Sequence, residues 1–131
     1  MAHHTHEVRI YYEDTDFSGV VYHANYFVWF EVGRCELLRS LGGTYREMET
    51  SGMRLPVIEA HCEFRTPAYY DDELEVSTTG SLLSSVRVKF CYQVTRRADR
   101  TVLAVGKTVH ASTNATGRPR RLPTKIQAAL T

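Results

Sequence analysis

The feature that most constrains the fold is a run of five apolar residues, Tyr26-Phe27-Val28-Trp29-Phe30, inside a stretch with helical character. Residues 24–41 contain no proline and include good helix formers, with opposite charges spaced three positions apart. Gly42-Gly43 supplies the stop, since glycine tolerates the left-handed conformation found just past a helix end. A helix that is apolar on every side is normally enclosed by other elements rather than laid on a surface. The sequence therefore predicts a helix over residues 24–41 that other elements wrap.

Segments with alternating apolar and polar residues are predicted to supply that wrapping, because a period of two is typical of a strand that buries one face. These segments are residues 6–12, 55–65, 73–79, 86–94 and 102–113, with turns at 67–72, 80–81 and 98–99 and short helices at 44–50 and 124–130. The short connections imply antiparallel pairing of the last three strands. We therefore expect an α+β fold in which a five-stranded antiparallel sheet wraps one long helix. The unpaired edges of such a sheet favour self-association.

Composition and charge disfavour several classes of protein. The 131 residues fit one domain spanning 1–131, and 16 basic against 15 acidic residues give a formal charge of +1, which argues against a nucleic-acid binder. No apolar run approaches the ~20 residues that cross a bilayer. The cysteines form no CxxC pair, which predicts free thiols in a soluble, cytoplasmic protein. The opening with His3, His4 and His6 is expected to be a disordered or tag-derived start rather than a metal site.

The loop between the first strand and the helix carries the residues best suited to chemistry. The N-terminus of a helix has unsatisfied N–H groups and a partial positive charge, so it attracts developing negative charge. Asp14 and Asp16 lie a few residues upstream and can fold back over that end. A carboxylate beside such an electrophilic site is the minimum equipment for hydrolysis of an activated acyl compound. In the plainer alternative, Asp14, Asp16 and Ser18 only cap turns, and His23 is a surface residue.

One continuous pattern resembles a known family. Tyr12-Glu13-Asp14-Thr15-Asp16, followed by Gly19-Val20-Val21-Tyr22-His23-Ala24-Asn25-Tyr26, is similar to the signature of hotdog-fold thioesterases. The resemblance is to the 4-hydroxybenzoyl-CoA thioesterase-like group, and in particular to the YbgC-type acyl-CoA thioesterases. It extends over nearly the whole chain and includes Phe64-Arg65-Thr66-Pro67-Ala68. It implies the hotdog fold, an antiparallel sheet around a helix, which agrees with the fold expected from periodicity.

The resemblance also implies roles for individual residues. Asp16 matches the catalytic carboxylate, which acts as a general base or as a nucleophile. The backbone N–H of His23 matches the group that polarises the thioester carbonyl, and its imidazole matches a side chain that assists catalysis. Tyr22 and Asn25 are expected to shape or orient the substrate site, whereas Asp14 is expected to order the loop.

The activity implied by the resemblance is hydrolysis of an acyl-CoA thioester to a carboxylic acid and CoA, without a metal or organic cofactor. The family assembles homodimers or homotetramers with sites at the dimer interface, so residues 55–65 of a second chain would complete the pocket. Some members place Arg or Lys at the start of the fourth strand, where this chain reads Leu82-Leu83-Ser84-Ser85. Arg118, Arg120 and Arg121 are therefore the candidates for binding the CoA phosphates, unless they form a solvated tail.

Two other functions stay open. An acyl-carrier-protein thioesterase would explain the missing basic residues, and a non-catalytic acyl-CoA-binding module would need neither Asp16 nor His23. A metal site is disfavoured because His23, His61 and His110 are unevenly spaced and form no ligand motif, and a serine hydrolase because no GxSxG elbow is present. A set of tyrosines is expected either to line an acyl pocket or to pack in turns: Tyr11, Tyr45, Tyr69 and Tyr70.

Overall fold

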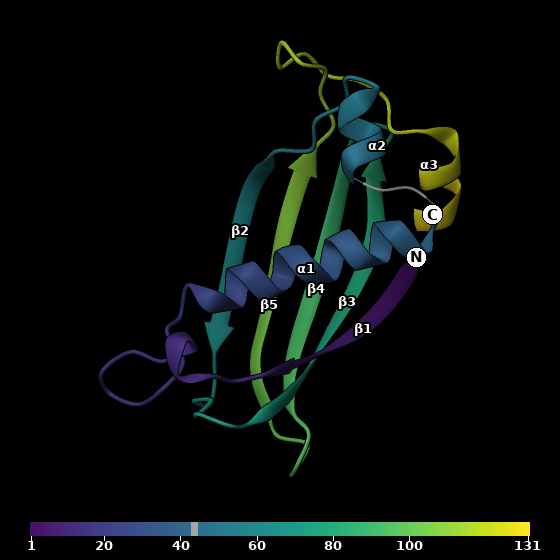
Figure 1. Cartoon of the computed structure of the whole chain (residues 1–131). Helices are drawn as coiled ribbons and strands as arrows, with labels where there is room; N and C mark the ends of the chain where they lie inside the picture. Colours follow the sequence, from purple (N-terminus) through teal and green to yellow (C-terminus); the bar gives the residue numbers. More distant parts are fainter. Residues whose placement is uncertain (43–44) are drawn as a thin grey trace.

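Long-range pairing of strands builds a sheet, and the longest helix crosses one face of it (Figure 1). The computed structural model describes residues 1–42 and 45–131. The strands are β1 (Ala2–Arg9), β2 (Val57–Phe64), β3 (Glu73–Ser84), β4 (Arg87–Arg96) and β5 (Val102–Ala111). They form a five-stranded sheet in the order β1-β3-β4-β5-β2, with antiparallel neighbours. The helices are α1 (Asn25–Ser40), α2 (Tyr45–Thr50), α3 (Thr124–Leu130) and the 3-10 turn η1 (Tyr12–Asp14).

Packing of α1 against the sheet makes the core. The covered side of α1 presents Trp29, Phe30 and Leu37 to the inward-facing residues of the strands. Phe30 is fully buried and stacks on Tyr92 of β4, with ring centroids 4.1 Å apart. The expected five-stranded antiparallel sheet is confirmed, and so is the alternation in its central strands. The alternating buried residues of β3 and β4 include Leu74, Val76, Val88, Phe90, Tyr92 and Val94.

The outer side of α1 is not covered within this chain. Phe27, Val28 and Val32 are 36%, 55% and 42% exposed. The prediction that other elements enclose the helix on every side is therefore wrong for the single chain. The physical reason is that the sheet lies along one side of α1, while the short helices α2 and α3 lie near one of its ends (Figure 1). The apolar side chains of the outer side remain free to contact another molecule.

The His-rich start belongs to a strand, so the expectation of a disordered segment is wrong. His3 and His4 lie opposite Thr79 and Thr78 of β3. Backbone pairing with a long neighbouring strand decides the structure here, because the histidine side chains themselves favour no strand. β1 also ends at Arg9, earlier than the predicted residue 12.

The turn expected at residues 80–81 is also wrong, because β3 continues to Ser84. Gly80 lies inside the strand, where a Cβ atom would be 2.9 Å from Leu130 Cδ2 and 3.0 Å from Leu37 Cδ2. The missing side chain lets α1 and α3 approach the sheet, so this glycine serves packing and not a turn. At the end of α1, Gly42 has a φ of +88°, as expected for a residue past a helix end, whereas Gly43 and Thr44 lie outside the described residues.

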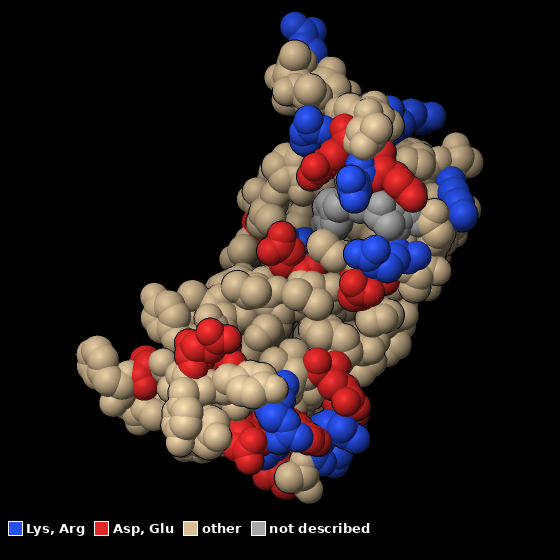
Figure 2. All heavy atoms as spheres, in the orientation of Figure 1, with Lys and Arg blue, Asp and Glu red and all other residues tan. Residues whose placement is uncertain are grey.

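Charged side chains are unevenly distributed over the surface, and the cysteines form no disulfide. Charged side chains gather toward the two ends of the face that carries α1, and some also lie along the helix, where Glu31 and Arg39 are exposed (Figure 2). The three cysteines, Cys35, Cys62 and Cys91, are free thiols as expected. Within residues 1–42 and 45–131, no helix is both long and apolar enough to cross a bilayer.

We expect Gly106→Ala to lower the free energy of unfolding by about 1–3 kcal/mol, the usual cost of overpacking a core. A Cβ atom at this position of β5 would lie 2.6 Å from Phe30 Cε2 and 2.8 Å from the backbone oxygen of His61. The backbone of β2 cannot move aside as a flexible side chain would, so the strain should persist. Urea unfolding measures the loss. Cys91→Ala, at an exposed position of β4, is the matched control and should change stability by less than about 0.5 kcal/mol. Equal unfolding midpoints for Gly106→Ala and the parent would contradict this account of the packing.

Candidate active site

A tight turn holds Asp16 near the start of α1. The Asp16 N–H donates to Val20 O at 2.9 Å, and the Gly19 N–H donates to Asp16 O at 3.1 Å. Gly19 has a φ of +88°, a conformation that favours glycine, which explains its place in the turn. The Val21 N–H donates to Ala68 O at 2.9 Å, which anchors the turn to a second loop. Two segments that are distant in the sequence therefore lie side by side.

The Asp16 carboxylate is exposed and is held by its own turn. Its Oδ1 accepts a hydrogen bond from the Ser18 N–H at 2.8 Å and another from the Ser18 hydroxyl. These bonds, the hydroxyl first, lower the pKa of Asp16 because they favour the ionised form. Asp16 is therefore a carboxylate at neutral pH, as a base or a nucleophile must be. The same bonds occur in an ordinary turn cap, so a catalytic assignment depends on what surrounds the carboxylate.

The N-terminus of α1 has backbone donors that meet no acceptor within residues 1–42 and 45–131. Ala24 precedes the helix and makes no side-chain capping bond, and the first turn contains no acidic residue. The N–H groups of Asn25 and Tyr26 donate to Tyr22 O and His23 O. In the described part of the chain, no acceptor meets the N–H of His23 or of Ala24. Together with the helix dipole, these two donors can stabilise a negative charge.

A pocket of about 410 Å³ brings Asp16 and His23 together. Its lining comes from both loops and from the end of β2, and includes Phe64, Pro67 and Ala68. The His23 ring packs edge-on against Phe64, with ring centroids 6.2 Å apart. A carboxylate, an imidazole and an uncapped helix end therefore border one cavity. This arrangement can polarise a carbonyl and deliver water or a nucleophile to it.

Arg65 lines the same pocket and was missed as a site residue by the sequence-based prediction. Its Nε lies 3.3 Å from Glu63 Oε1, and both side chains are about half exposed. The signal in the sequence was the segment Phe64-Arg65-Thr66-Pro67-Ala68, which belongs to the resemblance described above but by itself indicates no role. In the structure, the Arg65 guanidinium borders the pocket next to the Glu63 carboxylate.

Two of the predicted substrate-binding residues, Tyr22 and Asn25, lie beside the pocket. The Asn25 side chain donates to Asp14 O at 3.0 Å and to Asp14 Oδ1 at 3.4 Å. The Asp14 carboxylate also accepts the Tyr11 N–H at 2.8 Å, and the Asp14 carbonyl accepts the Tyr22 N–H. Asp14 therefore orders the loop, as expected, and Asn25 fastens the loop to α1. The Tyr22 ring is 48% exposed and packs edge-on against His23.

Two of the tyrosines expected near an acyl pocket, Tyr69 and Tyr70, take part in contacts between loops. Tyr70 stacks on Tyr12, with ring centroids 3.9 Å apart, and both rings are partly exposed. Tyr69 forms an isolated bridge with Val20, which joins the two loops a second time. Tyr11 is exposed, and the side chain of Tyr45 lies outside the described residues. These contacts agree with turn packing, the plainer of the two expectations.

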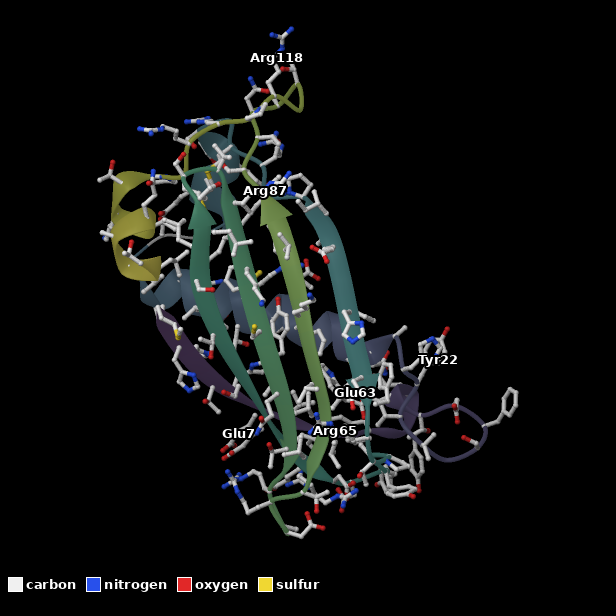
Figure 3. All side chains as sticks on the ribbon, turned by 180° about the vertical axis from the view of Figure 1, so that it is seen from behind. Glu7, Tyr22, Glu63, Arg65, Arg87 and Arg118 are labelled. Carbon is white, nitrogen blue, oxygen red and sulfur yellow. The ribbon has the colours of Figure 1, made fainter. Side chains whose placement is uncertain are left out.

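The predicted phosphate-binding arginines lie at the other end of the molecule from Asp16. Figure 3 shows Arg118 at the end opposite Tyr22 and Arg65. Arg120 donates to Ser51 O at 2.7 Å, which holds its side chain against the segment that follows α2. Within one chain, the structure therefore does not bring Arg118, Arg120 and Arg121 together with Asp16 and His23.

The histidines considered as metal ligands lie apart from one another. His110 is fully buried, with Nδ1 3.0 Å from Leu55 O and Nε2 2.8 Å from Thr108 Oγ1. Burial lowers the pKa of His110 to about 4, so this side chain is neutral at physiological pH. His61 lies on β2 and lines a different pocket from His23. In residues 1–42 and 45–131, no three His, Cys, Asp or Glu side chains lie close enough to hold a metal ion.

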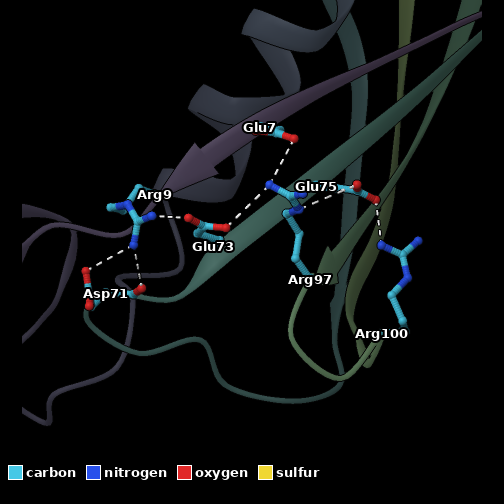
Figure 4. Close-up of polar contacts among 7 residues, drawn as sticks. All are labelled: Glu7, Arg9, Asp71, Glu73, Glu75, Arg97 and Arg100. Atoms are coloured by element: carbon cyan, nitrogen blue, oxygen red, sulfur yellow. Dashed lines mark hydrogen bonds and ion pairs between the residues drawn. The ribbon is translucent and has the colours of Figure 1, made fainter.

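Ion pairs stabilise the loop between β2 and β3, which lines the pocket with Pro67 and Ala68. Arg96 of β4, whose side chain is 16% exposed, lies 3.2 Å from Asp72 Oδ2 and donates to Pro67 O at 2.7 Å. Next to it, a chain of more exposed ion pairs links β1, β3 and the turn after β4 (Figure 4). Exposed pairs are worth up to about 1 kcal/mol each, whereas the more buried Arg96 also bonds directly to the loop at Pro67 O. The members of the chain are Glu7, Arg9, Asp71, Glu73, Glu75, Arg97 and Arg100.

We expect Ser18→Ala to raise the pKa of Asp16 toward its ordinary value, because the variant removes the hydroxyl donor to the carboxylate. The ionised fraction of Asp16 then falls at mildly acidic pH. Any reaction that needs this carboxylate should consequently lose rate at a higher pH than in the parent. A carbon-13 NMR titration of the Asp16 carboxyl measures the pKa. Ser51→Ala, which removes a hydroxyl that donates to Met48 O, is the control. An unchanged titration of Asp16 in Ser18→Ala would show that the hydroxyl has no such effect.

Comparison with known proteins identifies the family. A family model described as the thioesterase-like superfamily matches residues 10–130. The acyl-CoA thioester hydrolase YbgC of Escherichia coli O6:H1 is 32% identical over 122 residues, which cover 92% of this chain and 90% of that protein. YneP of Bacillus subtilis is 42% identical over 72 residues, which cover 55% of this chain and about half (52%) of YneP. A solved 1,4-dihydroxy-2-naphthoyl-CoA thioesterase from Synechocystis is similar with a TM-score of 0.92 and 26% identity, over 98% of this chain and 95% of that chain. The chain therefore belongs to the thioesterase-like superfamily, as a YbgC-type hotdog thioester hydrolase.

Proposed function

We propose that this protein hydrolyses acyl-CoA thioesters to a carboxylic acid and CoA in the pocket that Asp16 and His23 border. The observation that carries the proposal is that one cavity joins an ionised carboxylate to the uncapped N-terminus of a helix. The YbgC relative is named an acyl-CoA thioester hydrolase, which supports the same substrate class. The proposal needs neither a metal nor an organic cofactor, because the reacting groups are a side chain, a backbone amide and water.

In this proposal, the thioester carbonyl oxygen lies at the N–H of His23. As the carbonyl carbon becomes tetrahedral, negative charge develops on that oxygen. A well-placed donor stabilises such charge by about 3 kcal/mol, and the positive end of the α1 dipole adds to the effect. The N-terminus of α1 would therefore stabilise the transition state more strongly than the bound ester.

Two routes are open to Asp16. As a general base, it takes a proton from a water molecule that attacks the carbonyl carbon. As a nucleophile, it attacks the carbonyl carbon directly and forms a mixed anhydride, which water then hydrolyses. In both routes the CoA thiolate leaves, and with a thiol pKa of about 8.5 it needs little protonation. His23 is proposed to orient the water or to protonate the thiolate.

Asp16→Asn is expected to lower kcat by at least about 100-fold, the usual effect of removing a general base or nucleophile. The measurement is thiol release from an acyl-CoA ester at saturating substrate. Glu13→Gln removes a neighbouring exposed carboxylate from the same loop and should keep the parental rate. Near-normal turnover in Asp16→Asn would refute the assignment. Single-turnover hydrolysis in oxygen-18 water, together with trapping of acyl-Asp16, separates the two routes, because water that attacks the acyl carbon of the anhydride would also label the product. A general base puts the label in the product, whereas hydrolysis of the anhydride at the aspartyl carbon puts it in Asp16.

We further propose a homodimer formed through β2, or a homotetramer built from such dimers. β2 is an edge strand of the sheet, and its Ile58 and Phe64 are 46% and 47% exposed. Phe27, Val28 and Val32 on the outer side of α1 are further exposed apolar side chains. A strand edge with free backbone groups beside exposed apolar side chains favours pairing with a second copy.

Antiparallel pairing of two β2 strands would complete the pocket. The Phe64 end of β2 borders the pocket, whereas the Val57 end follows Arg54, which is bridged to Thr113. Thr113 is also bridged to Pro119, so the segment with the arginines lies at that end. A two-fold axis sets the Val57 end of one copy against the Phe64 end of the other. In such a dimer, Arg118, Arg120 and Arg121 of the second copy are proposed to bind the CoA phosphates at the site of the first.

A carrier-protein thioester is the second candidate substrate, because Leu82-Leu83-Ser84-Ser85 lacks the basic residues that the family resemblance led us to expect there. Rates on benzoyl-, short-chain and long-chain acyl-CoA, compared with the matching carrier-protein esters, separate these substrates. A non-catalytic acyl-CoA-binding module is the third alternative. It is disfavoured because binding alone requires neither the Asp16 carboxylate nor the His23 side chain in the pocket.

Ile58→Lys is expected to weaken the dimer at least about tenfold, because it places an unpaired ammonium group among apolar side chains that the partner would cover. Light scattering after size exclusion, across a dilution series, measures the dissociation constant. Leu83→Lys changes an aliphatic residue that is 52% exposed elsewhere on the surface and is the matched control. A monomeric parent, or a dimer that Ile58→Lys leaves intact, would contradict assembly through β2.

A further inference from the structure

A second cavity lies on the face of the sheet turned away from α1, apart from the proposed active site. It has a volume of about 480 Å³, and its lining comes from the middle of β2, β3, β4 and β5. Figure 3 looks onto this face of the sheet, with α1 behind the strands. We call it the outer hollow and define it by His61, Ser77, Thr79, Lys89, Cys91 and Lys107.

Short side chains make the depression in this face. The register sets Thr79 of β3 beside Cys91 of β4, Cys91 beside Lys107 of β5, and Lys107 beside His61 of β2. Because neighbouring strands are about 4.8 Å apart, these four side chains form a continuous row across the sheet. Ser77 lies two residues from Thr79 on the same face of β3. Hydroxyl and thiol groups therefore form a floor, and the longer lysine side chains border it.

The border of the outer hollow is cationic. Lys107 lies opposite Cys91, and Lys89 lies two residues from Cys91 on the same face of β4, so the two lysines are diagonal neighbours. Like charges at such positions repel each other. Lys107 Nζ lies 3.9 Å from Glu59 Oε1, and among the described residues no ion pair involves Lys89. None of the described residues that line the hollow is acidic. An anion bound between the two lysines would attract both of them and offset their mutual repulsion.

We propose that the outer hollow binds a phosphoryl group. The two lysine ammonium groups would donate to its oxygens and offset its charge, and the hydroxyls of Ser77 and Thr79 would supply further donors. A tetrahedral group with several free oxygens fits this arrangement better than a planar carboxylate, because the donors come from three different strands. Inorganic phosphate, pyrophosphate and the phosphates of CoA share this chemistry. The site does not depend on the activity proposed for Asp16.

A titration of the nitrogen-15-labelled full chain, followed by NMR, tests the proposal with phosphate, pyrophosphate and CoA in separate arms. Saturable shifts are expected at the backbone amides of Thr79, Cys91 and Lys107, with an affinity that falls as sodium chloride is added. Lys89→Gln and Lys107→Gln should each weaken binding about tenfold, the loss of one charge-assisted hydrogen bond. Lys125→Gln, on α3 and outside the hollow, is the control and should bind like the parent.

The arms also identify the source of the phosphoryl group. Similar binding of pyrophosphate and CoA would show that the phosphates alone are recognised, and binding of CoA alone would show that the rest of the molecule adds contacts. Binding of the inorganic ions without CoA would limit the site to small anions. The proposal is overturned if no arm gives saturable shifts at the three amides, or if both lysine variants bind like the parent. It is also overturned if the shifts appear only around His23 or Arg118.

Discussion

The position of α1 against the sheet is the constraint on which the rest of the structure depends. The ring of Phe30 occupies the place beside Gly106 where any side chain would meet both this ring and the backbone of β2. The same ring stacks on Tyr92, so α1 contacts the middle of the sheet at one defined point. From this point the helix extends to the end of β2, where its first residues meet the two loops. The width of the pocket between Asp16 and Phe64 is therefore a consequence of core packing.

The fold can be predicted from the sequence wherever a helix or strand buries one face, because its residues then follow a local periodic pattern. β4 alternates clearly because its buried residues face α1 and the intervening ones face outward. The sequence also predicts the helices well: the expected ranges 24–41 and 124–130 agree with α1 and α3 within one residue at each end. The His-rich start is not readable in this way, because its strand conformation comes from pairing with residues of β3 far along the chain. Gly80 led to the wrong prediction of a turn for a related reason. Close packing against Leu37 and Leu130 requires a glycine as strictly as a turn does.

The candidate site is predictable only in part. Its residues that lie on one continuous segment can be predicted, whereas those that long-range contacts bring to the pocket cannot. Asp16 and His23 lie on one continuous segment whose pattern marks both residues. The opposite wall, with Arg65 and Pro67, reaches the pocket through long-range contacts such as that between Val21 N–H and Ala68 O, which no local periodicity indicates. The outer hollow likewise arises from the register of four strands. The arginines near residue 120 are the extreme case, because their proposed role depends on a second chain.

Arg96 binds Asp72, Asp99 and the carbonyl of Pro67 at once, so one guanidinium ties the rim of the pocket to the hairpin between β4 and β5. The hairpin is distant in the sequence from Asp16 and His23. If it became mobile, the segment around Pro67 could move out of position while the sheet stayed folded. On heating, the protein should therefore become inactive before it melts. A ligand that fills the pocket should narrow the interval between these two temperatures.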